Sequence, residues 1–141
     1  MIYKVDFQKP TAAQRKVVRM RADGSLSACV SDLHVFPNFQ GFEVSQSDIS
    51  AISGPCVHPH KDGWIQTEKE PKIRRNCFWV LESTSCLYLH VGNAFTELLA
   101  GDYAVFDDSI VHSVISERKW WAVAYQLIPI AKPVTRKVNL S

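Results

Sequence analysis

The second half of the chain is a succession of short apolar segments separated by turn residues, and this pattern restricts the fold more than any other feature. Aromatic and β-branched residues fill the segments, which favours strands. Gly92-Asn93 is typical of a two-residue hairpin turn. Short strands at such even spacing predict a β-sandwich or a barrel. The expected strands are 73–82, 84–91, 94–100, 103–107, 111–117 and 120–129.

The first half of the chain is less regular. Strands are expected at residues 2–7 and 26–35, and a short helix at 11–20, for which Thr11 is the expected N-cap. Residues 63–72 are polar and charged, and we expect them to form an exposed loop beside the functional site.

Composition and length are those of one globular domain, which we expect to span residues 1–141. The formal net charge of +2 gives little support to nucleic-acid binding. No apolar stretch approaches the ~18 residues of a membrane span, and the N-terminus does not resemble a signal peptide. The four cysteines form no C-x-x-C pair, so we expect reduced thiols in a cytoplasmic protein.

Two histidine-bearing segments are the strongest candidates for chemistry. His60 and Asp62 form an H-x-D pair, and on an extended backbone residues i and i+2 point to the same side. His112 begins a later expected strand. Two imidazoles and one carboxylate on one face of a metal form the facial triad of non-haem Fe(II) oxygenases. The alternative is that these are hydrogen-bonded structural histidines, and we favour that role, or one beside the ligands, for His58.

One segment resembles a known family. The runs Val105-Phe106-Asp107-Asp108-Ser109 and His112-Ser113-Val114 resemble the aspartyl/asparaginyl β-hydroxylases, in which a strand ends in F-D-D-S and the distal iron-ligand histidine follows two residues later. Pro59-His60 resembles the P-H that presents the proximal ligand. We expect Asp107 and Asp108 to fix the turn and to orient His112.

The resemblance implies a mainly all-β double-stranded β-helix, a cupin-type jelly roll with at most one or two short helices. It implies an Fe(II)- and 2-oxoglutarate-dependent dioxygenase that uses O₂ to hydroxylate a C–H bond. The metal ligands would be His60, Asp62 and His112. The substrate class, a protein side chain or a small molecule, is left open, and so is a homodimer.

The sequence departs from the family at three positions. Animal members have Gly where this chain has Asp62, the family has His where Cys77 stands, and its co-substrate arginine corresponds to Ala122. We therefore expect another lysine or arginine to pair with the far carboxylate of 2-oxoglutarate.

Four further residues are expected to contact the co-substrate. Lys119 is favoured by its position, Arg118 is adjacent to it, and Arg75 resembles a family arginine that binds 2-oxoglutarate and substrate. His90 shares a strand face with Tyr88 and would reach the co-substrate if that face lies inside the barrel.

Two other functions compete with the oxygenase. The first is a metal-binding cupin, such as an isomerase, a sensor or a pseudo-enzyme, that does not turn over 2-oxoglutarate. The second is an interaction module without metal, which would leave the H-x-D pair and the distal histidine unexplained.

Overall fold

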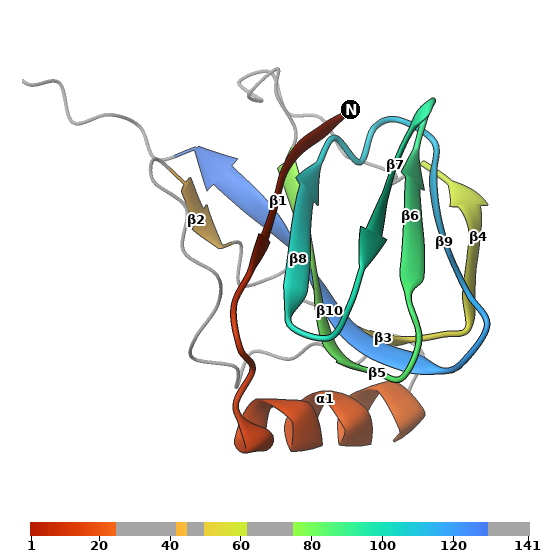
Figure 1. Ribbon diagram of the computed structural model, residues 1–141. Coiled ribbons are helices and arrows are strands. Elements are labelled where there is room, and N and C mark those ends of the chain that lie inside the picture. Colours follow the sequence, from red (N-terminus) through yellow and green to blue (C-terminus); the bar gives the residue numbers. More distant parts are fainter. Residues whose placement is uncertain (25–41, 45–49, 62–74, 130–141) are drawn as a thin grey trace, which may run out of the picture.

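The computed structural model describes residues 1–24, 42–44, 50–61 and 75–129. In these ranges ten strands form two antiparallel sheets, and one helix packs beside them (Figure 1). The elements are β1 (Ile2–Phe7), α1 (Ala12–Gly24), β2 (Phe42–Val44), β3 (Ser50–Ser53), β4 (Cys56–His60), β5 (Arg75–Ser83), β6 (Leu87–Val91), β7 (Ala94–Leu98), β8 (Asp102–Phe106), β9 (His112–Ser116) and β10 (Trp120–Pro129).

The strand order is that of a double-stranded β-helix. Sheet A has the order β1-β8-β5-β10-β2, with β3 also paired to β10, and sheet B has the order β4-β9-β6-β7. From β3 to β10 the chain passes between the sheets in the sequence A, B, A, B, B, A, B, A, and every pairing is antiparallel. This is the connectivity of a jelly roll. The expected all-β, cupin-type fold is therefore confirmed.

Two hydrophobic cores result, one on each face of sheet A. The interior core lies between the sheets, and the second lies between the outer face of sheet A and α1. Along β5 the side chains alternate: Phe78 and Val80 belong to the interior core, whereas Cys77 and Trp79 belong to the second core. Because the middle of β5 is buried on both faces, its residues 77–81 form a continuous apolar run without polar alternation.

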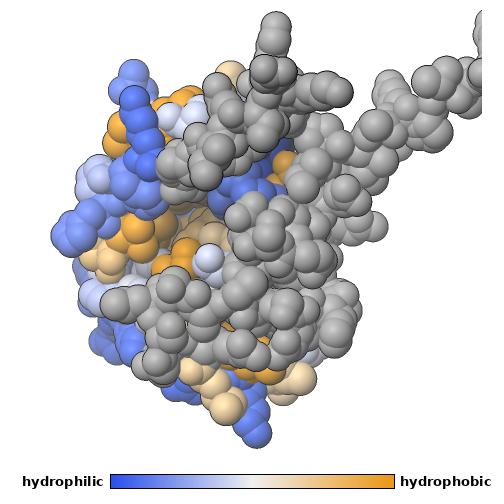
Figure 2. Space-filling model, turned by 180° about the vertical axis from the view of Figure 1, so that it is seen from behind, coloured by the Kyte–Doolittle hydropathy of each residue, from blue (hydrophilic) through white to orange (hydrophobic). Residues whose placement is uncertain are grey.

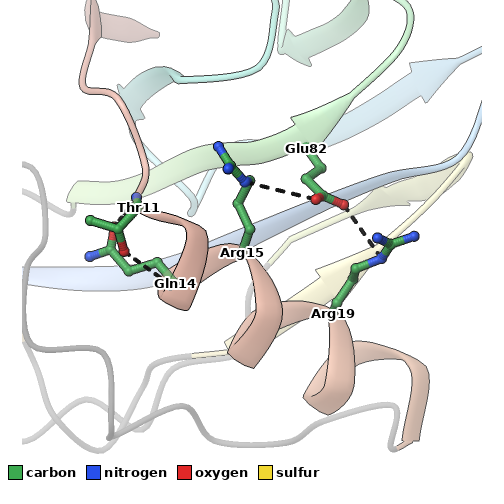
Figure 3. A network of polar contacts seen from close by, with 5 residues as sticks. All are labelled: Thr11, Gln14, Arg15, Arg19 and Glu82. Atoms are coloured by element: carbon green, nitrogen blue, oxygen red, sulfur yellow. Dashed lines mark hydrogen bonds and ion pairs between the residues drawn. The ribbon is translucent and has the colours of Figure 1, made fainter.

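The helix begins where the sequence predicts. The Gln14 N–H donates to Thr11 Oγ1 at 3.1 Å, and the Thr11 N–H donates to Gln14 Oε1 at 2.9 Å, which is a capping box. The helix ends at Gly24, later than expected. Arg15 and Arg19 form ion pairs with Glu82 of β5 at 3.9 and 3.4 Å, and these contacts join α1 to sheet A (Figure 3).

The strands expected beyond residue 75 are present with shifted ends, and the hairpin turn is where the sequence places it. Gly92 has a φ of 57°, and Val91 pairs with Ala94 across the turn. The strand β4 was not expected, because Pro55 precedes it and Pro59 lies within it. Residues 26–35 and 63–72 lie outside the described residues. The described ranges contain no helix long and apolar enough to cross a membrane.

Candidate metal centre

A bulge in β4 brings His60 to the interior of the barrel. Val57 pairs with Val114 and His60 pairs with His112, so the register shifts between Val57 and His60. Val57 and Val114 both pack with the interior core. A β-bulge inserts a residue and re-aims the side chains after it. His60 therefore shares the inward face with its partner His112.

The two imidazole rings lie side by side at one end of the barrel. Their centroids are 4.3 Å apart and their planes are tilted by 59°. The ring of Phe106, which belongs to the interior core, lies 5.0 Å from that of His112. His112 is 7% exposed, whereas His60 is exposed. We call this end of the barrel, where β4, β6 and β8 end and β5 and β9 begin, the mouth; it is the upper end in Figure 1.

Backbone carbonyls fix the tautomer of both rings. His60 Nδ1 lies 2.8 Å from the carbonyl oxygen of His58, and His112 Nδ1 lies 2.8 Å from that of Ile110. A carbonyl only accepts, so each Nδ1 carries a proton and donates it. In a neutral ring the lone pair is then on Nε2, which is how metal-bound histidines are usually held.

These two residues fit a divalent transition metal. Imidazole nitrogens bind such ions at about 2.0–2.1 Å, and two rings this close can each offer one nitrogen to a single ion. The expected third ligand, Asp62, lies outside the described residues. Within the described part of the chain no three His, Cys, Asp or Glu residues form a group that could hold a metal. The described site is thus a pair, and Asp62 stays a prediction.

A polar cluster on sheet A faces the mouth from the other side of the interior. Asn76 pairs with Phe106 on one side and with Gln126 on the other. Asn76 Nδ2 donates to Asp108 Oδ2 at 3.4 Å, and Gln126 Nε2 donates to the same oxygen. Asp108 is fully buried and Asn76 is 7% exposed. Neither amide was predicted from the sequence, although each interrupts an apolar strand.

Asp107 and Asp108 have different partners. Asp107 Oδ1 accepts from the backbone N–H and the hydroxyl of Ser109 at 2.9 and 2.6 Å, so it holds the turn before His112. Asp108 joins β5 to β10 through the two amides. The described contacts of Asp108 thus lie across sheet A.

Arg75 lies on the outer face of sheet A. It alternates with inward-facing Asn76 and pairs with Leu127 of the second core. Its guanidinium carbon is 3.5 Å from the centroid of the Tyr3 ring, which packs against the same core. The sheet therefore separates the Arg75 side chain from the histidine pair, and a contact between Arg75 and the co-substrate stays a prediction.

Lys119 and Arg118 lie at the opposite end of the barrel. They follow β9, and its five residues separate them from His112 by about 17 Å at ~3.3 Å per residue. Figure 1 shows the β9–β10 connection at the lower end, beside α1. Lys119 Nζ lies 5.1 Å from the centroid of the Trp121 ring, which packs on the second core. The structure does not bring these two cations to the mouth.

His90 faces outward from sheet B. Its neighbours Leu89 and Val91 belong to the interior core, so alternation places His90 and Tyr88 on the other face. The His90 ring is stacked on Phe95, which is 63% exposed, with centroids 5.8 Å apart. A contact between His90 and the co-substrate would require this face of the strand to lie inside the barrel, and it lies outside.

Comparisons with known proteins give only distant similarities. No protein-family model and no curated protein matches the sequence. A cupin-2 domain containing protein from Shewanella frigidimarina is 14% identical, with a TM-score of 0.42 over 67% of this chain and 85% of that one. A protein from Neisseria meningitidis is 13% identical, with a TM-score of 0.45 over 71% and 96% of the two chains. A Klebsiella pneumoniae protein with a double-stranded β-helix domain is 21% identical, with a TM-score of 0.35 over 70% and 86%. The fold assignment rests on the strand order of this chain itself.

Proposed function

We propose that this protein is an Fe(II)-dependent oxygenase in which His60 and His112, with Asp62 as the third ligand, hold one metal ion at the barrel mouth. One observation carries the proposal: two imidazoles from adjacent strands share the inward face with their centroids 4.3 Å apart, and both Nδ1 atoms are bound to carbonyls. Two structural histidines would not need the same tautomer on the same face.

The proposed reaction is the hydroxylation of a C–H bond of a small molecule or peptide. A bound Fe(II) supplies the redox chemistry: one atom of O₂ enters the substrate and the other enters 2-oxoglutarate, which loses CO₂ to become succinate. The chain itself positions the reactants. Phe106 and the interior core form an apolar wall beside His112, and such a wall excludes bulk water from the reacting atoms.

A second candidate function is favoured by one observation. The inward side chains of β10 among the described residues are Trp120, Ala122, Ala124 and Gln126, and none carries a positive charge. A metal-binding cupin that does not use 2-oxoglutarate needs no cation there. The oxygenase needs one from outside the described ranges, such as Arg74.

Metal binding is tested first, by anaerobic titration of the purified chain with Co(II) and Fe(II). We expect one ion per chain, and His60→Ala or His112→Ala should each weaken binding by about 10²-fold or more, since a ligand in a structural zinc site contributes a few kcal/mol. His90→Ala, on the outer face of sheet B, is the matched control and should leave the affinity unchanged. Wild-type protein that binds neither ion would refute the metal site.

The co-substrate is tested on the Fe(II)-loaded protein. The oxygenase predicts that succinate forms from 2-oxoglutarate in the presence of O₂, even without a substrate, and that His112→Ala abolishes it. A protein that binds Fe(II) with the expected histidine dependence but releases no succinate is the second candidate.

A further inference from the structure

The polar cluster on sheet A uses both of its amide donors on one carboxylate. Asn76 Nδ2 and Gln126 Nε2 both donate to Asp108 Oδ2. Because an ionised carboxylate only accepts, the orientation of the Asn76 amide is determined, with its nitrogen toward Asp108. Its carbonyl oxygen must therefore point to a different neighbour.

No donor among the described residues reaches Asn76 Oδ1. This atom is buried and has no hydrogen-bond partner in the described part of the chain, although the residue is only 7% exposed. Native proteins pair the large majority of buried polar atoms, and a buried acceptor without a donor lowers stability. A ligand that donates a hydrogen bond to Asn76 Oδ1 would supply the partner that this atom lacks.

The cluster and the histidine pair lie at the same end of the same interior. Asn76 stands beside Phe106 in the register of sheet A, and the Phe106 ring lies 5.0 Å from the His112 ring. Phe106 is thus a neighbour of Asn76 in the sheet and, through its ring, of His112. A ligand that contacts both groups must displace the side chains that cover the buried Asn76 Oδ1.

The polar groups around the cluster indicate which kind of ligand it could bind. Asp108 is fully buried and points to the interior side of sheet A, where Asn76 and Gln126 reach it. No lysine or arginine of the described strands faces this interior: Arg75 points to the second core, and Arg118 and Lys119 lie at the far end. The acceptor Asn76 Oδ1 favours a group that donates hydrogen bonds over a carboxylate, which only accepts them.

From these contacts we infer that Asn76 Oδ1, beside Asp108, is a subsite for an N–H donor of the substrate, an ammonium or a primary amide. The inference rests on the proposed function in that this substrate is the one oxidised at the histidine pair. It makes Asn76 a specificity-determining residue and predicts that the protein prefers amines or amides to organic acids of the same length.

The test uses the full chain labelled with ¹⁵N and three matched probes: butylammonium, butyramide and butyrate. Side-chain NH₂ signals of Asn76 and Gln126 are followed by two-dimensional NMR, first in the apo protein and then with Zn(II). Butylammonium and butyramide should shift these signals, and butyrate should bind about tenfold more weakly or worse. Asn93, exposed in the β6–β7 turn, is the internal control and should not move.

Asn76→Leu is the decisive variant: it keeps the size of the side chain and removes the acceptor, together with the Nδ2 donor to Asp108, to which Gln126 still donates. Followed through Gln126, butylammonium binding should weaken about tenfold, whereas Asn93→Leu should have no effect. Equal shifts with butyrate, no shift with any probe, or equal movement of Asn93 would each overturn the subsite.

The two proposals fail separately in this design. Amine binding by a protein that takes up no metal would refute the oxygenase and keep the subsite. Metal binding with the expected histidine dependence, but without amine binding, would refute the subsite alone.

Discussion

Trp120 attaches the start of β4 to the interior core, and this attachment can be tested through Trp120→Phe. The indole N–H donates to the carbonyl of Pro55 at 3.1 Å, and the Gly54 N–H donates to the Trp120 carbonyl at 3.0 Å. A Cβ atom on Gly54 would lie 2.0 Å from the indole nitrogen, so only glycine fits against the ring. The segment that leads to His60 is thus held on Trp120.

The expected loss of stability from Trp120→Phe is about 2 kcal/mol. Pro55 keeps a second donor, the Ser116 N–H at 3.1 Å, so the lost indole bond contributes only about 1 kcal/mol. Trp120 is fully buried, and replacing indole by a smaller ring leaves a cavity that adds about 1 kcal/mol. For a domain of this size the melting temperature should fall by roughly 8 °C.

Trp79→Phe is the matched control. Trp79 is also fully buried, and its indole N–H donates to the carbonyls of Gln8 and Gly101 at 3.0 and 3.3 Å, but it lies in the second core. Both variants should therefore lose a similar amount of global stability. Only Trp120→Phe should release β4 and weaken Co(II) binding at His60.

Amide hydrogen exchange distinguishes the local effect from the global one. Cys56 and Val57 should exchange about tenfold faster in Trp120→Phe than in Trp79→Phe, which corresponds to about 1.4 kcal/mol of local opening. Equal exchange of β4 in the two variants, with equal Co(II) affinity, would show that Trp120 contributes only to overall stability.

Three further predictions concern stability. Glu82→Gln should lower the free energy of unfolding by at most about 1 kcal/mol, because its ion pairs are partly exposed, and the difference in urea midpoint should disappear in about 1 M NaCl; persistence in salt would contradict this. Gly101→Ala should lower it by about 1–3 kcal/mol, because its φ of 93° strains any L side chain; an unchanged thermal midpoint would argue against that strain. Burial raises the pKa of both the Cys77 thiol and the Tyr125 hydroxyl, so the folded state keeps protons that the unfolded state releases above the ordinary values of 9.0 and 10.0. Stability should fall as pH rises above about 9, and Cys77→Ala should delay the fall in urea titrations between about pH 8 and about pH 11; an identical onset in the variant would refute the role of the thiol.

Much of the fold was predictable because its signals are local. Turn residues separate the strands of the second half, and the Thr11 capping box starts the helix, so neither feature depends on distant contacts. The sequence also selected the two histidines that the structure pairs. The alternation of Leu89, His90 and Val91 could have placed His90 outside the barrel, since the apolar residues of that strand take the inward positions.

The contacts of the basic residues could not be predicted in the same way. The strand that follows Arg75 is buried on both faces, so its apolar run gives no indication of which face is inside. Arg75 takes the outward position, and Asn76, one residue later, takes the inward one. The place of His60 likewise depends on the bulge in β4, which shifts the alternation by one residue and has no signal in the sequence.

Pro59 affects how the edge strand β4 could pair with a strand of another molecule. In the described part of the chain β4 pairs only with β9, so its other side is an edge of sheet B. A free edge offers backbone groups on which a second chain can add a strand, and proline interrupts that row because it has no N–H. Pro59, which precedes His60, thus leaves this described edge strand with one N–H fewer for such pairing, and natural sheets use proline on edge strands to limit edge-to-edge aggregation.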